Sequence, residues 1–434
     1  MKCCICGSEN WHRLEGAHSE SLIVVCKECG LLGHYVDQER RGKMLAYYKT
    51  QYRQLPDHHE LLTKHNKLRY VQRWLGEYLQ GKKNLLCGDV GAATGYVLSF
   101  LKQLGHRVRG SEWDLLRRRF SEHYYGIPLE EQLNTKEPYD LLLIIHTLEH
   151  MIEPDKRLTE YVSALKDDGR LLISCPYWLE TLEEQSGQPI QTFDNLFHKD
   201  HINLFTREAL KNLFRKAGLA IEREDVQTYG QTYLLKKGKP SDIVKEDWQQ
   251  VADKLLKQKD AMRLFHERKF KKAVDVWPAF PEAHLQLILG TYGKDPGRQE
   301  DMFSALPEPC KQNHRIRAAI AQWLTQMGKL DDAKKAWEMT FQTRPHPQFL
   351  MECGRVLVRL GRPKEALPLF AAVCQWDPRQ WPECQNWMAK AACSIGAWDE
   401  QAKEQIKEAM LKQALETGAA KIELTEAPAT GAQA

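Results

Sequence analysis

Four cysteines near the N-terminus have the type and spacing of a metal site. They form two C-x2-C-G units separated by nineteen residues: Cys3, Cys6, Cys26 and Cys29. Each unit can turn two thiolates toward one ion, and four thiolates complete a closed tetrahedral site with no open position for catalysis. We therefore predict a zinc ribbon over residues 1–35 that holds structural Zn²⁺. Coincident thiols or a lost metal are the alternative, and Cys4 is a spare thiol.

A second candidate site is a glycine loop followed by an acid. The run Asp89–Gly95 has the sequence D-V-G-A-A-T-G, and Glu112 follows about twenty residues later at the end of the next apolar stretch. Gly91 and Gly95 let the backbone approach a ligand closely, and the Glu112 carboxylate can accept hydrogen bonds from both hydroxyls of a ribose. The acid inside the loop departs from the G-x-G-x-x-G of dinucleotide-binding folds.

The elements that must position this loop alternate along the chain. We predict strands at 84–90, 106–111, 140–145 and 171–175, with a helix after the glycine loop and another that ends near 167–169. Continuous apolar runs are typical of buried parallel strands. The sequence therefore predicts an α/β doubly wound, Rossmann-like sheet, in which ligands bind at the carboxyl ends of the strands.

Residues 84–238 resemble a class I S-adenosylmethionine-dependent methyltransferase. The resemblance rests on the D-V-G-A-A-T-G loop, on G-S-E at 110–112, on the run 139–150 that ends in L-E-H, on Pro154, and on H-K-D-H-I-N-L-F-T at 198–206. It also includes the strand pair 220–226 and 232–235, whose last strand is usually antiparallel in this family. A zinc ribbon before such a domain is similar to methyltransferases of sugar and surface-polysaccharide pathways.

The resemblance implies a cofactor role for six residues: Asp89, Gly91, Ala93, Gly95, Glu112 and His146. The first loop residues would hold the methionine end of S-adenosylmethionine, Glu112 its ribose, and His146 would lie beside the sulfonium. Ala93 stands where the family usually has a glycine, so its methyl group could crowd the cofactor. A degenerate domain that binds no cofactor is the alternative.

Methyl transfer to a weakly acidic acceptor needs alignment and a base. Histidine suits the role because its unperturbed pKa is near 6.5. Candidates follow the predicted strands: His146, His150, His198 and His201. We expect His201 to be the base, with His150 second. The alternative for His201 is a structural hydrogen bond that fixes the polar segment 177–197, which we predict to be a substrate lid.

Residues 36–83 form a basic connector. Between positions 39 and 83, eleven lysines and arginines stand against four acids, with tyrosines interleaved. We expect an amphipathic helical connector whose leucines and Val71 face a core and whose basic face is solvated. Binding of a phosphate-rich or sugar-nucleotide ligand is the alternative.

The C-terminal part contains repeats. Gly328 and Gly361 begin similar hexapeptides 33 residues apart, Pro345 and Pro378 share that offset, and Gly396 restarts the pattern. After a linker helix at 239–262, residues 263–415 resemble tetratricopeptide repeats, and 416–434 form a disordered tail. Such arrays bind a protein segment or mediate self-association, and a merely stabilising extension is the alternative. The tryptophans are expected mostly in the core: Trp323, Trp337, Trp376, Trp387 and Trp398.

Composition limits the remaining choices. The 434 residues are 42% hydrophobic and 28% charged with net charge +4, which excludes a collagen, a coiled-coil rod or a wholly disordered chain. The longest apolar run, Leu141–Ile145, is far short of the ~20 residues that span a membrane. No signal-peptide core follows Met1, so we expect a cytoplasmic protein with reduced cysteines.

The leading hypothesis is methyl transfer from S-adenosylmethionine to a small-molecule or glycan acceptor, most simply a sugar or nucleotide-sugar. A protein or RNA methyltransferase recruited through the repeats is the second hypothesis, although the near-balanced charge does not favour nucleic acid. A non-catalytic repeat scaffold is the third.

Overall fold

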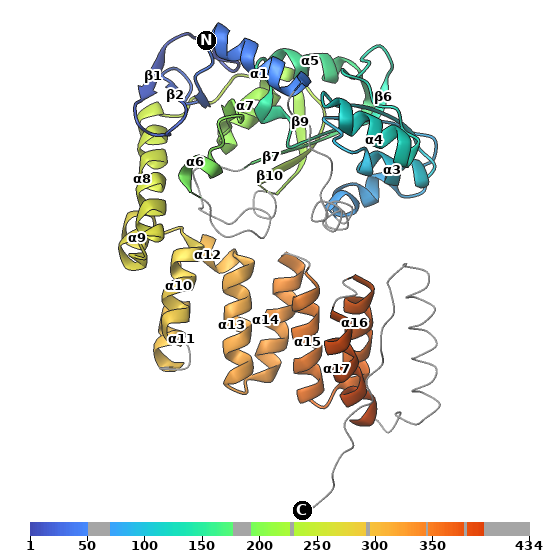
Figure 1. Ribbon diagram of the computed structural model, residues 1–434, viewed down its shortest axis with the longest axis vertical. Coiled ribbons are helices and arrows are strands. Elements are labelled where there is room, and N and C mark those ends of the chain that lie inside the picture. Colours follow the sequence, from blue (N-terminus) through green and yellow to red (C-terminus); the bar gives the residue numbers. More distant parts are fainter. Residues whose placement is uncertain are drawn as a thin grey trace, which may run out of the picture. The chain divides into compact units, whose positions relative to one another are not determined.

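The computed structural model describes residues 1–50, 70–176, 192–225, 230–291, 296–343, 346–376 and 380–394. By its internal contacts the chain divides into two compact units, Met1–Ile316 and Arg317–Ala434. Figure 1 shows an α/β layer arrangement within the first unit and helices alone in the second. Among the described residues, no helix combines the length and the apolar character that a bilayer crossing requires.

A six-stranded mixed sheet forms the centre of the first unit. Its strands are β4 (Leu86–Val90), β5 (Arg107–Ser111), β6 (Tyr139–Ile145), β7 (Leu165–Cys175), β9 (Leu219–Asp225) and β10 (Gln231–Lys237). The order is β5-β4-β6-β7-β10-β9, with the first four parallel and β10 antiparallel to both of its neighbours. The sheet confirms the expected Rossmann-like methyltransferase fold and its antiparallel last strand.

Each strand buries alternate side chains on opposite faces of the sheet. Leu142 and Ile144 of β6 face the core that α5 (Pro154–Ser163) and α7 (Arg207–Ala217) cover. Leu141 and Leu143 face the opposite core, which α3 (Tyr96–Gln103) and the helical residues 70–79 cover. Of the expected apolar residues of the basic connector, Val71, Leu75 and Leu79 pack in this second core, whereas residues 51–69 lie outside the described part.

The predicted helix end near 167–169 is wrong. Helix α5 ends at Ser163, and β7 already begins at Leu165, so the Asp167-Asp168-Gly169 turn signal lies inside the strand. Tyr139 pairs with Leu165, and the register shifts before Leu141 pairs with Arg170. The irregularity accommodates the turn-forming residues, so tertiary strand pairing overrides the local signal.

Both ends of helix α7 lie at residues that favour a helix end. Thr206 caps the helix with its hydroxyl, which accepts a 3.0 Å hydrogen bond from the Ala209 N–H, and Gly218 ends it in the left-handed conformation. Likewise, Asp114 caps α4 (Leu115–Tyr125) by accepting from the N–H groups of Leu116 and Arg117. Short-range capping thus fixes the helices that flank the strand ends.

A second, four-stranded sheet contains the N-terminal segment. Its order is β1-β2-β3-β8, from β1 (Trp11–Leu14), β2 (Ile23–Cys26), β3 (Leu32–His34) and β8 (Asn203–Leu204). All neighbours are antiparallel. Strand β8 comes from the methyltransferase region, so the ribbon and the α/β part of this unit share a sheet. Helix α1 (Gln38–Thr50) follows the ribbon.

The ribbon also packs against a helix from far along the chain. Helix α8 (Trp248–His266) lies beside β2, and Figure 1 shows the two together. Ile23, Val25 and Leu32 of the ribbon share one core with Leu255 of α8 and with Phe197. This core continues into α9 (Phe270–Val276) and α10 (Pro281–Thr291), which therefore belong to the first unit.

Helices make up the rest of the described chain. They are α11 (Pro296–Ser304), α12 (Glu308–Gln312), α13 (His314–Gln326), α14 (Leu330–Thr343), α15 (Pro347–Arg359), α16 (Pro363–Trp376) and α17 (Trp381–Ser394). Gly328 and Gly361 both have positive φ values, 72° and 70°, at corresponding positions before α14 and α16. Trp323 and Trp337 are buried, whereas Trp376 and Trp387 are partly buried.

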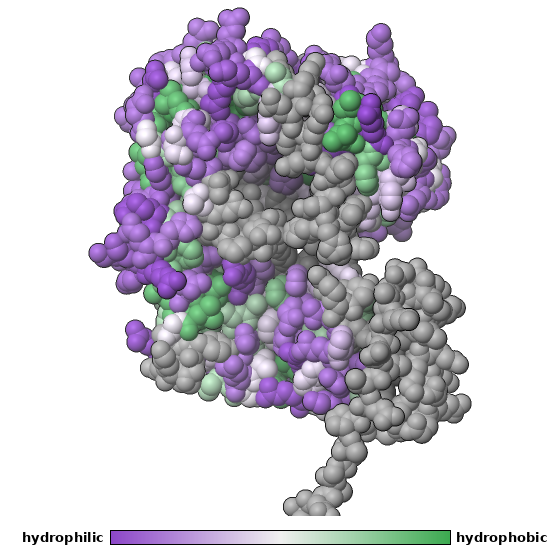
Figure 2. All heavy atoms as spheres, in the orientation of Figure 1, coloured by the Kyte–Doolittle hydropathy of each residue, from purple (hydrophilic) through white to green (hydrophobic). Residues whose placement is uncertain are grey.

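The face of the molecule in Figure 2 is mainly hydrophilic where its residues are described, and the hydrophobic residues on that face form small separate patches. The apolar side chains are instead concentrated in the buried clusters. Several predicted features lie outside the described residues: most of the lid, at 177–191, with Val226, Pro345, Pro378, Gly396, Trp398 and the tail 416–434. The tetratricopeptide resemblance of the helices remains a prediction.

Candidate functional site

The glycine loop lies at the carboxyl end of β4. Gly91 has φ +74°, and a Cβ added there would lie 2.3 Å from Oγ1 of Thr147, so only glycine fits against the β6 loop. Ala93 also has a positive φ, 49°, which a side chain rarely adopts. The backbone N–H of Ala93 donates a 2.9 Å hydrogen bond to Oε2 of Glu112. The acid at the end of β5 thus reaches back to the loop at the end of β4.

Glu112 is fixed before any ligand contributes. Its second oxygen, Oε1, accepts a 3.0 Å hydrogen bond from the N–H of Asp114. A carboxylate has about four lone-pair sites, so acceptor capacity remains for ribose hydroxyls. The geometry therefore fits the role that the sequence implies for Glu112.

Two of the expected cofactor residues do not line the cavity. Asp89 is 4% exposed within β4, and Gly95 faces α4, where an added Cβ would lie 2.2 Å from Oγ of Ser121. Gly91, Ala93 and Glu112 do line it. Gly95 therefore permits close packing of the loop against α4 in this structure.

His146 occupies a strained position at the end of β6. Its φ is +51°, and its N–H donates a 2.8 Å hydrogen bond to the carbonyl of Ser174 on β7. Nonglycine residues in this region cost of order 1 kcal/mol or more and concentrate at functional sites. Its Nδ1 lies 3.7 Å from Oε1 of Glu149. The strand end therefore presents an imidazole to the cavity with a carboxylate behind it.

Glu149 is a buried acid surrounded by histidines. It is 1% exposed, and neither carboxylate oxygen has a hydrogen-bond partner within 3.5 Å among the described residues. Burial alone would raise the pKa of Glu149, but His146, His150 and His201 together lower it below its ordinary value. The carboxylate is therefore charged at neutral pH.

His150 and His201 face one another across two segments. Their ring centroids are 4.7 Å apart, and Nδ1 of His150 lies 2.9 Å from the carbonyl oxygen of Asp200, so it carries the proton in this contact. Burial, with help from nearby His150, lowers the pKa of His201 to about 3, although Glu149 opposes the shift. His201 is consequently a neutral imidazole at physiological pH. His198, the fourth candidate, lies at the cavity wall with its side chain half exposed.

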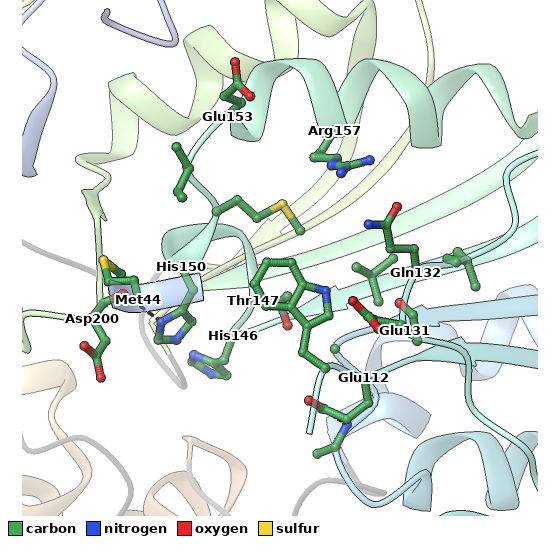
Figure 3. Close-up of a pocket in the computed structure, with 18 of the residues that line it drawn as sticks. Met44, Glu112, Glu131, Gln132, His146, Thr147, His150, Glu153, Arg157 and Asp200 are labelled. Atoms are coloured by element: carbon green, nitrogen blue, oxygen red, sulfur yellow. Dashed lines mark hydrogen bonds between the residues drawn. The ribbon is translucent and has the colours of Figure 1, made fainter. Parts of the chain in front are cut away.

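Gly91, Ala93 and Glu112 line one cavity of about 1050 Å³ together with the four histidines, and Glu149 lies buried behind its wall. Figure 3 shows its two ends, with Glu112, Glu131 and Gln132 at one and His146, His150 and Asp200 at the other. A volume of this size lies at the upper end of the roughly 300–1,000 Å³ that is usual for small-ligand pockets. The cavity can therefore accept a cofactor together with a second molecule.

The sequence did not identify several lining residues: Met44, Trp113, Arg117, Gln132, Arg157 and Tyr161. Trp113 directly follows Glu112, which was a usable signal. Glu153, Arg157, Glu160 and Tyr161 follow helical spacing on α5, a pattern that indicates one face of a helix. Nothing in the sequence indicated that α1 and α5 would meet, as they do where Arg41 lies 3.4 Å from Glu153.

The four predicted zinc ligands come together at the ribbon tip. Sγ of Cys3 lies 3.5 Å from Sγ of Cys29, Cys6 and Cys26 are equally close, and all four sulfurs lie within 4.8 Å of one another. Thiol hydrogen bonds from Cys29 and Cys3 lower the pKa of Cys26, which favours a thiolate there. Four converging sulfurs fit a structural Zn²⁺. Cys4 instead directs its thiol to Oδ1 of Asn203 at 3.8 Å.

A second group of possible metal ligands lies inside the cavity region. One atom from each of Glu149, His150 and His201 lies within 4.8 Å of the others. A carboxylate and two imidazoles leave coordination positions open, which is typical of catalytic rather than structural metal sites.

Comparisons with known proteins give a family match and several similar solved structures. Residues 59–224 match a family model described as a methyltransferase domain. No curated protein matches the chain. Among solved structures, the magnesium protoporphyrin IX methyltransferase from Synechocystis PCC 6803 with bound SAH is 14% identical, with a TM-score of 0.34. That match covers 46% of this chain and 99% of the other.

Two further solved structures are similar at the same level of identity. An S-adenosylmethionine dependent methyltransferase from Mesorhizobium loti is 14% identical, covers 38% and 97% of the two chains and has a TM-score of 0.32. The ribosomal protein L11 methylase from Lactobacillus delbrueckii subsp. bulgaricus is 14% identical, covers 38% and 76%, and has a TM-score of 0.27. The family match confirms the expected enzyme class, an S-adenosylmethionine-dependent methyltransferase.

Proposed function

We propose that this methyltransferase transfers the methyl group of S-adenosylmethionine to a hydroxyl of a sugar, nucleotide-sugar or glycan acceptor, with His201 as the base. The observation that carries the proposal is the single cavity that joins Gly91, Ala93 and Glu112 at one end to three histidines at the other. Cofactor and acceptor can thus meet with the methyl group between them.

The cofactor end of the cavity would bind and orient S-adenosylmethionine. Glu112 would accept the ribose hydroxyls, and the backbone of Gly91 and Ala93 would approach the methionine part. Bound S-adenosylmethionine supplies a methyl group that its sulfonium already activates. The protein then gains most by holding donor and acceptor in line, which can contribute several kcal/mol to the rate.

The histidine end accepts the proton. As the acceptor oxygen forms its bond to the methyl carbon, the carbon–sulfur bond breaks and the hydroxyl proton passes to the neutral imidazole of His201. The nearby Glu149 carboxylate stabilises the imidazolium that results, as a buried acid does behind other catalytic histidines. General-base help typically contributes about 10²–10⁴-fold, and the lowered pKa of His201 makes it a weak base, so its contribution belongs at the lower end of this range. His150 is the second candidate for the same proton.

The polar rim supports a hydroxyl-rich acceptor. Arg41 pairs with Glu153 at 3.4 Å, and Arg157 pairs with Glu160 at 2.8 Å, all four at the cavity wall. Paired charges offer donors and acceptors together, which suits neutral or mildly charged sugars better than a polyanion. The resemblance of the ribbon-plus-domain arrangement to enzymes of sugar pathways points the same way.

A divalent cation at Glu149, His150 and His201 is a second candidate for activating the acceptor. The two buried oxygens of Glu149, which lack hydrogen-bond partners within 3.5 Å among the described residues, favour it. A bound cation would lower the pKa of a hydroxyl that it contacts.

Acceptor assays with His201→Ala and Glu149→Gln distinguish these roles. If His201 is the base, kcat falls by about 10²–10⁴-fold in His201→Ala, and chelators leave wild-type transfer unchanged. If a cation acts, chelation abolishes wild-type transfer and added Mg²⁺ or Mn²⁺ restores it. Lack of methyl transfer to any sugar, nucleotide-sugar or glycan by a protein that binds S-adenosylhomocysteine would contradict the proposal.

Deletion of the second unit tests the macromolecular alternative. The cut belongs at residue 316 rather than 262, because Ala273, Trp277 and Phe280 pack in the core of the first unit. A sugar-directed enzyme keeps its activity without residues 317–434. Loss of activity toward a protein or RNA acceptor alone would favour recruitment through the repeats.

A further inference from the structure

The segment that carries His201 is bounded by contacts with the N-terminal ribbon. Strand β8, two residues after His201, pairs with β3 of the ribbon, with Leu32 opposite Leu204 and Gly33 opposite Asn203. The N–H of His34 donates a 2.9 Å hydrogen bond to the carbonyl of Ile202, the residue next to His201. The ribbon therefore fixes the backbone on the C-terminal side of the histidine.

The same ribbon histidine fixes the N-terminal side. His34 is fully buried, and its Nε2 lies 3.1 Å from the carbonyl oxygen of Phe197. A carbonyl can only accept, so Nε2 carries the proton, and Nδ1 accepts from the Ser21 hydroxyl at 2.6 Å. One side chain and its own backbone thus hold both ends of the 197–202 segment.

Additional contacts reinforce this attachment along the segment. Arg40, just after the ribbon, donates 2.8 Å hydrogen bonds to the carbonyls of Tyr35 and Lys199. Upstream, Nε2 of His18 lies 3.2 Å from the carbonyl oxygen of Asp194. Each of these partners is a backbone carbonyl, so the contacts determine where the chain runs.

The attachment continues to the strand end that carries His150. Asn203 of β8 donates a 2.7 Å hydrogen bond from Nδ2 to the carbonyl of Met151, the residue after His150. Its Oδ1 accepts from the thiol of Cys4, which lies beside the zinc ligand Cys3. The ribbon, the His201 segment and the L-E-H turn are consequently joined through one asparagine.

We propose that the ribbon is a positioning element of the active site, in which Gly33, His34 and Arg40 hold the 197–204 segment so that His201 faces His150 and Glu149. In this role the ribbon controls the chemical step and leaves cofactor binding to the glycine loop and Glu112. The link to catalysis rests on the proposed function, whereas the link to the position of His201 does not.

Gly33→Ala is the sharpest test. A Cβ at Gly33 would lie 2.7 Å from the carbonyl oxygen of Ile202, so β3 and β8 must move apart. Gly76→Ala is the matched control, because nothing lies within 4 Å of a Cβ in that helix. His34→Ala removes the Phe197 contact, and His34→Gln keeps an N–H that can donate to the same carbonyl.

Two measurements need no methyl acceptor. Amide hydrogen exchange in peptides that cover 197–204 should accelerate by about tenfold or more in Gly33→Ala and His34→Ala, and recover in His34→Gln. Acylation of His201 by diethyl pyrocarbonate, followed by mass spectrometry, should accelerate in the same variants. Gly76→Ala should match the wild type in both, and Arg40→Met should show a smaller effect than Gly33→Ala.

Kinetic and binding measurements on the same variants test the link to catalysis. With an acceptor in hand, kcat should fall by about 10–100-fold in Gly33→Ala, while KM for S-adenosylmethionine and the affinity for S-adenosylhomocysteine stay unchanged. Zinc content and thermal unfolding verify that each variant is folded. Unchanged exchange and acylation in folded Gly33→Ala and His34→Ala would overturn the proposal, whatever the acceptor proves to be.

Discussion

The cofactor end and the histidine end of the cavity draw on different stretches of the chain. Gly91, Ala93 and Glu112 come from one strand–helix–strand unit, and a single hydrogen bond from Ala93 to Glu112 joins its two strand ends. His150 and His201 come from separate segments, and contacts with His34 and Arg40 of the N-terminal region hold the second of them.

This difference determines what a distant perturbation can reach. The cofactor end keeps its geometry as long as its own strands pair. The histidine end depends on every interface between the segments that carry His150, His201 and the supporting His34. Damage to the ribbon should therefore separate cofactor binding from methyl transfer.

Removal of a predicted zinc ligand should have the largest effect. A structural zinc contributes of order 10 kcal/mol to the fold of a small domain, so Cys26→Ser should lower the zinc content below one per chain and reduce Tm by many degrees. Methyl transfer should disappear with the metal, because Cys26 and Cys29 pack in the same core as Phe205, next to β8.

Cys4→Ser is the matched control for the metal site. Cys4 is equally buried beside Cys3, but its thiol contacts Asn203 and it lies outside the four-sulfur cluster. It should keep one zinc per chain by metal analysis. Full zinc content and an unchanged Tm in Cys26→Ser would show that the cluster is not a structural metal site.

Removal of the Glu112 carboxylate should act on the cofactor end of the cavity. Hydrogen bonds to a charged group contribute about 1.5–3 kcal/mol, so Glu112→Ala should weaken S-adenosylhomocysteine binding by about 10–100-fold in calorimetry. Hydrogen exchange over 197–204 should stay at the wild-type rate, since that segment has its own supports.

Glu137→Ala provides the control for Glu112→Ala. Glu137 is another acid of the same sheet region, but it pairs with Arg109 at 3.5 Å and does not line the cavity. Its substitution should leave the affinity unchanged. An equal loss of affinity in both variants would mean that the negative charge of this region, and not a contact of Glu112 with the ribose, determines the affinity.

Acid should destabilise the protein through His34. Burial lowers the pKa of His34 to about 3, from 6.5 when unfolded, with His18, Arg40 and His201 opposing its charge as well. The folded state therefore binds fewer protons between these values, so stability is full above pH 7 and decreases as pH falls below about 6.5. For His34 alone the loss between pH 7 and pH 5 is ~2 kcal/mol.

Urea unfolding at pH 7 and pH 5 measures this loss. His34→Gln cannot titrate, so its stability should decrease less than that of the wild type over the same interval. Equal decreases in the two proteins would contradict the prediction that His34 is buried in its neutral form.

The sequence predicted the locally built end well and the assembled end poorly. The D-V-G-A-A-T-G loop, the strand before it and the acid after the next strand are contiguous signals, and three of the six predicted cofactor residues line the cofactor end of the cavity: Gly91, Ala93 and Glu112. His146 and His150 line the histidine end. His201 also reaches the cavity, but nothing in its own segment showed that His34 would hold it.

Long-range pairing explains what the sequence could not indicate. The two-residue strand β8 has no periodic signal of its own and exists because β3 pairs with it. In the same way β7 begins at Leu165, inside the expected helix, because β6 pairs with it. Local patterns predict elements, whereas such pairings depend on segments that meet only in the folded chain.

Ala93→Gly changes only the cofactor end of the cavity and should have the smallest effect. Ala93 has φ +49°, which costs an alanine about 1 kcal/mol, whereas glycine adopts it freely but loses up to about 1 kcal/mol more entropy on folding. Stability in urea should therefore change by less than about 1 kcal/mol.

If the alanine methyl crowds the cofactor, affinity for S-adenosylhomocysteine should rise by less than about tenfold, with no change in hydrogen exchange over 197–204. Ala93→Val should instead destabilise the loop, because a β-branched residue is strongly disfavoured at positive φ. Weaker binding in Ala93→Gly would mean that the alanine holds the loop in its binding conformation, and that the local unit uses this strained residue to fix its shape.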